Sequence, residues 1–485
     1  MYKTAKLSMK KTILLLINCC VLAGLYGQEG IQFTSTDTSL QTAFYRAKEM
    51  ALSYKGKPGD PVGAWYESAL PPRYAFCMRD VSHQSIAAEI LGLNKENKNM
   101  FTLFVKNISA NKDWCSYWEM NRLGKPAPED YRNDKEFWYN LNANFDLLTA
   151  CWNMYLWTGD EEYIKGKLFE NFHNKSVTDY IASWVLNPDS LLTRPAHPNA
   201  PVPFNDQDAF HRCRGLPSYS EGVPNIKMGV DLIAAIYRGL LSYSAILQAG
   251  GQQKKAELYA QKAKAYQQHI DADWWDDAAS LYHTYYSNNN QFGRDEGETF
   301  LLWFDALKDS TRKQKTLQHL LSQKWNVENL SYFPLIMYQN GYDDEAYKYM
   351  LHLTNPSTER KEYPEVSFGV IKGFVQGLMG IDGDARFNRV NTFYRGQKEI
   401  TSTVNKVPLL KTFISVTHNG SKQSSLTNTG KKAITWRAKF SGDHTSILVN
   451  NKPARVRKEK DWLGNIISFT DVIVGPGKVM NIKVI

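Results

Sequence analysis

Apolar residues recur every three to four positions from about residue 38 to residue 380. This spacing places them on one face of a helix, so it predicts a run of amphipathic helices. Gly and Asp residues, as in WTGDEEY at 157–163 and NGYDDEAY at 340–347, predict where helices end. We expect about a dozen helices, the next-to-last range forming two, over residues 39–54, 80–93, 96–109, 139–158, 161–171, 176–186, 229–248, 252–270, 298–307, 311–323, 330–354 and 366–380.

The period of the pattern changes to two at about residue 388. Segments such as KEITSTVNKV, KTFISVTHNG and KAITWRAKF alternate polar and apolar residues, and turn sequences such as HNG and GPGK separate them. This alternation predicts a β-sandwich over residues 388–485. Two long polar segments, 110–138 and 187–228, interrupt the helical region. Long loops within a compact domain are usually functional, so we expect the site there.

This order of elements predicts a mainly α fold, an (α/α)6 barrel over residues 28–387 followed by the β-sandwich. In such a barrel, six helical hairpins close around a core, and one end of the barrel holds the binding cleft. A helical-repeat solenoid is the alternative, but the sequence shows no repeat of fixed period.

The N-terminus reads as a leader sequence. It has a basic start and an apolar run over 13–25, which is shorter than the ~20 residues that cross a bilayer. A signal peptide over residues 1–27 is therefore expected, with export to the periplasm and no membrane span. Cys19 and Cys20 leave a lipoprotein anchor as the less favoured alternative.

Charge and motif content narrow the function classes. The net charge is +9, but no dense basic block occurs, so we expect no nucleic-acid partner. No C-x-x-C, HExxH or Asp-x-Asp-x-Asp-Gly pattern is present, so we expect neither a metal nor a cofactor. Four Cys follow the leader, and they are expected as buried residues, with one disulfide left open. Aromatic residues make up 13% of the chain, and some are expected to line a sugar-binding groove.

Arg79 and Asp80 stand at a predicted helix start, directly after PPRYAFCM. A carboxylate can accept hydrogen bonds from two vicinal hydroxyls, and Arg donates in a fork, so the pair suits a polar ring. A structural ion pair is the alternative. His83, one turn later, is expected to pack or to hydrogen-bond within its own helix.

Several segments resemble the six-hairpin glycosidases, a superfamily that includes glucoamylases, trehalases, processing α-glucosidases and α-L-rhamnosidase-type catalytic domains. GVDLIAAIYRGLLSYSAILQAGG at 229–251 resembles their central helix. FWYNLNANFDLLTACWNMYLWTGDEEY at 137–163 and SFGVIKGFVQGLMGIDGDARFNRV at 367–390 resemble two further barrel helices. Members carry an Arg-Asp pair that grips the terminal sugar, so the resemblance implies this role for Arg79 and Asp80.

The resemblance also implies where the catalytic carboxylates lie. Hydrolysis of a glycosidic bond requires two of them. The superfamily's acid usually precedes the central helix, which implies Glu221, with Asp206 or Asp208 as an alternative. The base comes from late in the barrel, which implies Glu365, although the usual base motif is not clearly present. Members with a known mechanism are mostly inverting.

Other residues are expected to contact the sugar. Trp114, Trp118 and Tyr219 are expected to line the subsites. Asp231 and Glu298 are included as binding residues, with a role at a helix start as the alternative.

We therefore expect an exported, exo-acting, inverting glycoside hydrolase that removes a terminal α-linked sugar from an oligosaccharide or polysaccharide. A polysaccharide lyase that uses Tyr219 or His211 beside Arg212 and Arg214 is one alternative. A non-catalytic glycan-binding protein is another.

Overall fold

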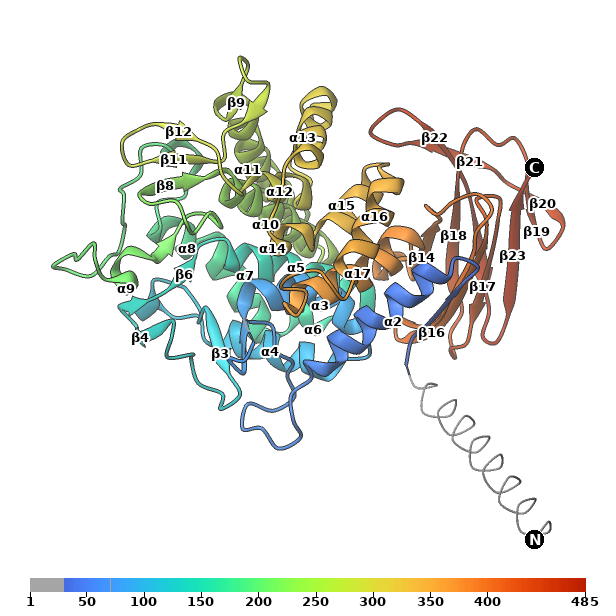
Figure 1. Cartoon of the computed structure of the whole chain (residues 1–485), viewed down its shortest axis with the longest axis horizontal. Helices are drawn as coiled ribbons and strands as arrows, with labels where there is room; N and C mark the ends of the chain where they lie inside the picture. The colour runs from blue at the N-terminus through green and yellow to red at the C-terminus, as the bar shows by residue number, and fades with distance from the viewer. Residues whose placement is uncertain (1–29, 70) are drawn as a thin grey trace, which may run out of the picture.

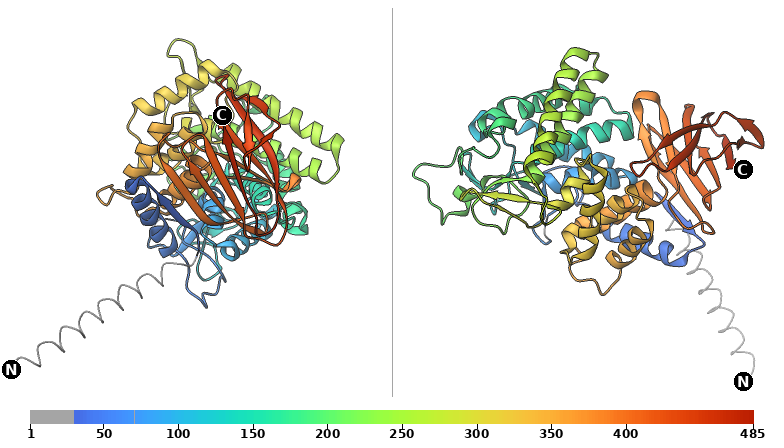
Figure 2. Two further views of the ribbon diagram at one scale, coloured as in Figure 1. Left: turned by 90° about the vertical axis from the view of Figure 1, so that its right-hand side faces the viewer. Right: turned by 90° about the horizontal axis from the view of Figure 1, so that it is seen from above.

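The computed structural model describes residues 30–69 and 71–485, and the predicted leader over 1–27 lies outside them. Helices fill the first part of the described chain, and two β-sheets lie against one side of the helical region (Figures 1 and 2). The predicted mainly helical fold with a β domain at its C-terminal end is confirmed at this level.

Largely buried helices follow one another in contact around a ring. The contacts run from α17 to α3, α5, α10 and α12, and from α15 back to α17. Trp303, the last residue of α12, closes the ring because its indole lies 4.8 Å from the ring of Tyr332, directly before α15. The bounds are α3 Met78–Ile90, α5 Ala143–Thr158, α10 Val230–Ala249, α12 Glu298–Trp303, α15 Phe333–Gln339 and α17 Pro364–Lys372.

Each ring helix packs against an outer helix. α17 contacts α2, and the other ring helices contact the outer helices that follow them in the chain. Short turns join α3, α10, α12 and α15 to the outer helix that follows each of them, whereas long segments such as 107–142 lead back to the next ring helix. The long segments therefore gather at the N-terminal ends of the ring helices. The outer helices are α2 Thr38–Ser53, α4 Asn94–Lys106, α7 Lys167–Val177, α11 Gln253–Asp273, α13 Ser310–Ser322 and α16 Asp343–Leu353.

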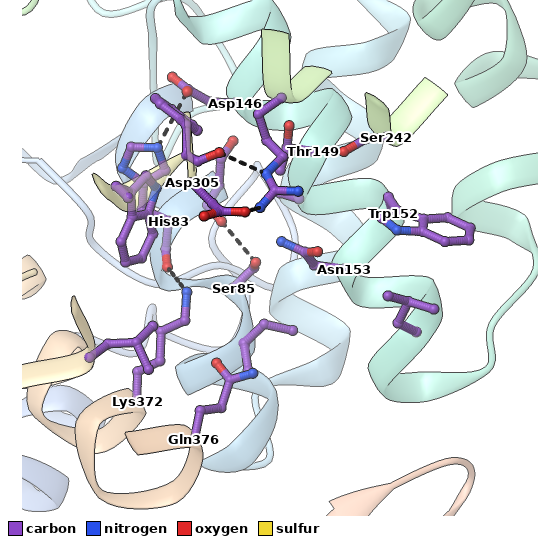
Figure 3. A pocket seen from close by; sticks show the side chains of 18 of the residues that line it. His83, Ser85, Asp146, Thr149, Trp152, Asn153, Ser242, Asp305, Lys372 and Gln376 are labelled. Carbon is purple, nitrogen blue, oxygen red and sulfur yellow. Dashed lines mark hydrogen bonds and ion pairs between the residues drawn. The ribbon is translucent and has the colours of Figure 1, made fainter. Parts of the chain in front are cut away.

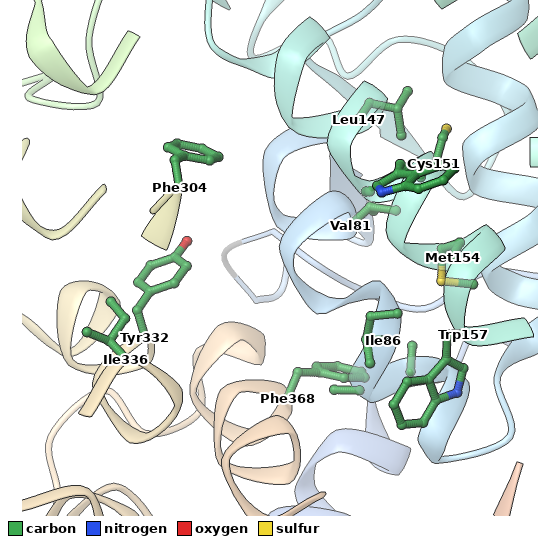
Figure 4. Packing of buried hydrophobic residues seen from close by; sticks show 14 of the residues in the cluster. Val81, Ile86, Leu147, Cys151, Met154, Trp157, Phe304, Tyr332, Ile336 and Phe368 are labelled. Carbon is green, nitrogen blue, oxygen red and sulfur yellow. The ribbon is translucent and has the colours of Figure 1, made fainter. Parts of the chain in front are cut away.

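Apolar packing between α3, α5 and α17 forms much of the core. Figure 4 shows Val81 and Ile86 of α3 beside Leu147, Cys151 and Met154 of α5. Most aromatic residues serve packing, and Trp157, Trp184, Trp274 and Trp436 are fully buried. The four cysteines at 77, 115, 151 and 213 are buried and free, so the disulfide left open is absent among the described residues. Of the described helices, only α10 is long and apolar enough to span a bilayer, and it is mostly buried in the ring.

The β domain consists of two sheets. The larger has the order β1-β15-β16-β17-β23-β19-β20, and the smaller has the order β13-β14-β18-β22-β21. The strands are β1 Gln32–Ser35, β13 Asp382–Asp384, β14 Arg389–Phe393, β15 Thr401–Leu409, β16 Thr412–Asn419, β17 Gln423–Asn428, β18 Ile434–Ser441, β19 Ile447–Val449, β20 Lys452–Ala454, β21 Arg457–Lys460, β22 Ile466–Val474 and β23 Val479–Val484.

Two of these strands lie outside the predicted domain of residues 388–485. β13 precedes residue 388, and β1 comes from the start of the described chain and pairs antiparallel with β15. The boundary predicted from the change of period is therefore corrected, because a short strand shows too little alternation to be recognised. The β domain contacts the C-terminal end of α5, where Trp157 Nε1 donates to Pro408 O at 2.8 Å.

Gly380 joins the last helical turn to β13, and its backbone needs a residue without a Cβ. Its φ is +57°, and a Cβ there would lie 1.9 Å from the carbonyl oxygen of Phe393. We expect Gly380→Ala to lower the free energy of unfolding by about 3 kcal/mol or more, as steric strain at a special backbone conformation does.

Gly251→Ala is the matched control for this prediction. Gly251 has a φ of +76°, but nothing lies within 4 Å of its added Cβ. It should lose only about 1–2 kcal/mol, the cost of a left-handed backbone. Thermal unfolding of both variants provides the measurement, and equal losses would contradict the proposed steric conflict.

Candidate active site

Arg79 and Asp80 lie in the first turn of α3, which follows the short strand β2 (Ala75–Cys77). β2 pairs with β3 (Glu119–Asn121) in one of the segments expected to be loops, and this pairing fixes where α3 begins. Arg79 Nε donates to Asp80 Oδ1 at 2.9 Å. Arg79 Nη2 also lies 3.5 Å from Oε1 of Glu365, in the first turn of α17. Packing of α17 against α3 thus brings together two carboxylates and one guanidinium.

The two carboxyl groups carry different charges. Burial favours the neutral form of Asp80, but the charge of Arg79 and a hydrogen bond from Glu365 outweigh it and hold the pKa of Asp80 below its ordinary value. Burial and the neighbouring Asp80 carboxylate raise the pKa of Glu365 well above its ordinary value. Two close carboxyl groups commonly share one proton. Here Glu365 holds it and Asp80 is ionised.

Glu221 lies near this pair, in the loop between β7 (Arg214–Leu216) and β8 (Ile226–Gly229). Its Oε1 accepts a hydrogen bond from Asn140 Nδ2 at 2.7 Å. The side chain is open to solvent, yet enough protein surrounds the carboxylate to raise its pKa, and Arg79 partly opposes this. The structure thus places Glu221 within electrostatic reach of Arg79 and Asp80.

Two of the three predicted aromatic residues pack on Arg79. The guanidinium carbon lies 5.0 Å from the ring centre of Tyr219 and 5.9 Å from that of Trp118. Both rings are buried, so they hold the guanidinium in place and do not offer an open face to a sugar. Trp114 lies elsewhere, with Lys175 Nζ of α7 4.3 Å from its ring centre.

Asp231 is fully buried and faces the protein interior. It accepts hydrogen bonds from the Tyr219 backbone N–H at 2.7 Å, from Ser218 Oγ at 2.9 Å and from Asn142 Nδ2 at 3.1 Å. Burial nevertheless raises its pKa to about 6. The predicted sugar contact is therefore corrected to a role that positions Tyr219.

Glu298 also lies outside the carboxylate cluster. It is buried at the start of α12, and its Oε2 lies 2.5 Å from Nδ1 of His319 in α13. Burial raises the pKa of Glu298, and the hydrogen bond to Glu298 raises that of His319. The pair joins a ring helix to its outer helix, so the predicted sugar contact of Glu298 is corrected as well.

Asp208, the alternative acid, caps the short helix α9 (Ala209–Arg212) at the edge of the molecule (Figure 1). It forms an ion pair with Arg132 Nη1 at 3.0 Å. Glu136 and His211 lie close to it, and the three residues have the proximity of metal ligands. However, Arg132 also binds Glu136 at 2.7 Å, so the two carboxylates already neutralise a cation. This group is a peripheral ion-pair network.

Sequence reasoning missed a second acidic cluster beside the first. Glu119 Oε1 lies 3.1 Å from Arg73 Nε, and Asp130 accepts from Arg73 Nη2 at 2.8 Å. Burial and Asp130 raise the pKa of Glu119 to about 8, and Asp80 contributes to this rise. Glu119 lies opposite Cys77 in the β2–β3 pair. Its only signal in the sequence is its position in the polar loop 110–138.

His83 packs against the rings of Trp303 and Tyr332, as one of the two expectations had it, but its hydrogen bonds run across the ring and not within its own helix. Its Nδ1 lies 2.8 Å from the Tyr332 hydroxyl, and its Nε2 lies 3.4 Å from Asp146 Oδ1 on α5. Asp146 also accepts a hydrogen bond from the Tyr219 hydroxyl. Together, His83, Tyr332, Asp146 and Tyr219 form a layer of contacts across the ring, one turn of α3 beyond Arg79.

A cavity of about 440 Å³ lies on the other side of this layer, inside the ring (Figure 3). His83 and Asp146 line one part of it, and residues from the C-terminal ends of the ring helices line the rest. The carboxylate cluster lies outside this cavity. We take the cluster as the candidate active site, because it holds carboxyl groups of different charge within the electrostatic influence of the solvent-exposed Glu221.

Asp231→Ala tests the positioning role of Asp231. We expect it to lower the free energy of unfolding by about 2–4 kcal/mol, because three buried donors lose their acceptor. Asp231→Asn retains one carbonyl oxygen and should lose less. Thermal or denaturant unfolding gives the comparison. An unchanged midpoint in Asp231→Ala would favour the sugar contact over the positioning role.

No protein-family model and no curated protein matches this sequence. Solved structures do match. An α-L-rhamnosidase from Dictyoglumus thermophilum aligns with a TM-score of 0.58 and 13% identity over 94% of this chain and 50% of its own. A GH78 family rhamnosidase of Bacillus sp. GL1 aligns with a TM-score of 0.56 and 13% identity over 82% and 40%. A sialidase aligns with a TM-score of 0.55 and 11% identity over 90% and 41%.

This chain thus spans half or less of the length of these neighbours. At such low identity, the similarity is one of fold. The resemblance stated from the sequence motifs is confirmed at that level: the chain has a fold of the six-hairpin glycosidase type.

Proposed function

We propose that this protein is a glycoside hydrolase that acts on an oligosaccharide or polysaccharide. The observation that carries the proposal is the presence of two different carboxyl groups under the influence of Arg79: Glu221, whose pKa is raised by burial, and Asp80, whose pKa Arg79 lowers. Glycoside hydrolysis typically uses one protonated and one ionised carboxyl group. The fold likeness to rhamnosidases supports the same reaction class.

We assign Glu221 as the acid. It is the solvent-exposed carboxyl group of the cluster, and a protonated carboxyl there can donate to the leaving oxygen. Arg79 retains an exposed part and can donate to a sugar hydroxyl, while Asp80 accepts from one. We further propose that the sugar held here is a terminal α-linked one, so that the action is exo.

The base function is assigned to the Asp80–Glu365 pair. Glu365 alone was expected as the base, but its raised pKa keeps its proton, and a base must be ionised. The negative charge of the pair lies on Asp80, which can take a proton from water. We propose an inverting reaction, in which a water molecule fits between the acid and this pair, as inverting enzymes require a separation of about 6.5–9.5 Å.

We further infer that the ring is a complete (α/α)6 barrel and that the protein is exported, with the periplasm as its location. The ring contacts support the first inference. The basic and apolar pattern over residues 1–27 supports the second.

The lyase alternative gains no support from the site. Tyr219 is buried, donates to Asp146, and has a pKa raised well above its ordinary value by burial, which makes it a poor base. His211 is engaged with Glu136 at 3.2 Å. Arg214 is buried and pairs with Asp113.

Glu221→Gln tests the acid. The amide keeps the shape of the side chain but has no proton to donate, so hydrolysis of the cleaved substrate should fall by about 10²–10⁴-fold. Release of reducing sugar from a panel of glycans gives the measurement. Asp208→Asn is the comparison, since Asn also caps helices and α9 lies at the edge of the molecule; its activity should stay near that of the wild type. Undiminished hydrolysis by Glu221→Gln rules out the assignment.

Asp80→Asn and Glu365→Gln separate the two members of the pair. If Asp80 carries the charge, Asp80→Asn should reduce kcat by about 10²-fold or more, as loss of a general base does. Glu365→Gln should cost less, because its amide still donates to Asp80 as the protonated acid does. The reverse order in kcat, measured on the same substrate, would show that Glu365 is the ionised base.

A further inference from the structure

The cavity inside the ring is a chemical environment distinct from the carboxylate cluster. It lies toward the C-terminal ends of the ring helices, beyond the His83–Asp146 layer. The cavity opens to solvent, because four residues of its lining are exposed. They lie in α5, just after α12, at the end of α15 and in β13. These residues are Asn153, Asp305, Gln339 and Asp382.

Lys372, the last residue of α17, lines this cavity. Figure 3 shows it pointing toward His83, whose carbonyl oxygen accepts from Lys372 Nζ at 3.5 Å. The amine also lies 4.2 Å from the centre of the Trp303 ring. Among the described residues, no carboxylate oxygen lies within 4.0 Å of this amine, the distance that defines an ion pair.

The other charged groups of the cavity do not compensate Lys372. Asp305 lies 3.7 Å from Arg238, and Asp146 accepts from the Tyr219 hydroxyl and lies 3.4 Å from His83, so both carboxylates have other partners. On the far side, a small cavity of about 20 Å³ separates Lys372 from Glu365, which holds its proton. Asp382 is the one carboxylate whose field stabilises the ammonium form.

Desolvation without a close counter-ion favours the neutral amine. Burial accordingly lowers the pKa of Lys372 to about 7, with a smaller opposing effect from Asp382. The neutral form of Lys372 is therefore much more populated near pH 7 than that of an ordinary lysine, which is neutral in roughly one molecule in 10³. The neutral amine is the form that attacks a carbonyl carbon.

We propose that Lys372 is a carbonyl-reactive amine and that the cavity around it is a second site, which takes small polyhydroxylated aldehydes such as the open-chain form of a reducing sugar. The amine nitrogen adds to the aldehyde carbon. The carbonyl oxygen then leaves as water, and a reversible imine remains. No oxidant or reductant is consumed. The proposal is independent of the function assigned to the carboxylate cluster.

The cavity suits such a ligand in size and lining. Its volume of about 440 Å³ exceeds what a single sugar requires, and typical small-molecule sites begin at about 300 Å³. Ser85, Ser242 and Asn153 supply neutral hydroxyl and amide groups that can bind hydroxyls. Arg238 and Asp305 in the cavity lining lie close enough to neutralise each other, so the cavity offers little attraction for an ionic ligand.

Reductive trapping with a limiting amount of glyceraldehyde tests the proposal. The intact protein is incubated at pH 7 with glyceraldehyde and cyanoborohydride, and labelled peptides are quantified over time by mass spectrometry. We expect Lys372 to be labelled at least tenfold faster than surface lysines. Its rate relative to them should fall as the pH rises from 7 to 9, because Lys372 is then fully neutral while the fraction of neutral surface lysines still increases.

Lys313 is the matched internal control. Its amine is also partly buried, has a lowered pKa caused by burial and lies 4.9 Å from the ring centre of Trp462, but Asp305 lies 3.8 Å away as a counter-ion. Lys372 should therefore be labelled at least tenfold faster than Lys313. Labelling of Lys372 no faster than Lys313 would overturn the proposal.

A Lys372→Met variant adds a second readout. In the folded variant, the fast component of total labelling should disappear while the slow component from surface lysines remains. A fast component that persists would assign the reactive amine to another position and would also overturn the proposal. If the variant fails to fold, the peptide map of the unchanged chain decides alone.

Discussion

The position of one guanidinium determines the character of the candidate site. Arg79 lies between Asp80 and Glu365 and against the rings of Tyr219 and Trp118. Without a positive charge here, two buried carboxyl groups from different helices would both favour the neutral form. With the positive charge of Arg79, Asp80 is ionised while the neighbouring Glu365 retains a proton. Two carboxyl groups therefore differ in charge and can take different roles.

The rest of the structure holds Arg79 in this place. The β2–β3 pair fixes the start of α3, and packing of α17 against α3 brings in Glu365. Tyr219, which covers the guanidinium, is positioned by Asp231 through its backbone and by Asp146 through its hydroxyl. Asp231 and Asp146 therefore act through Tyr219 on one face of the guanidinium.

The sequence predicted the parts of this arrangement that depend on local pattern. The helix periods, the change to period two and the Arg79–Asp80 pair at a helix start are all visible in short segments. Glu221 and Glu365 were predicted as candidates because each stands at a loop or helix start near a recognisable motif. Glu119, Asp146 and Lys372 were missed, since their roles arise from contacts between segments that are far apart in the chain. Asp231 and Glu298 were misread, because the sequence does not show whether a residue at a helix start faces the site or the interior.

The pairing of β1 with β15 has a consequence for how the molecule assembles. Phe33 and Val404 are neighbours in the sheet although about 370 residues separate them in the chain. Such a non-local contact slows folding, because the intervening chain must first be brought into order. During synthesis the N-terminal strand has no partner until residues 401–409 are made, and until then its edge can pair with other chains. The β domain therefore joins the beginning of the described chain to its C-terminal part. A fragment that ends near residue 388 would lose the pairing of β1 with β15.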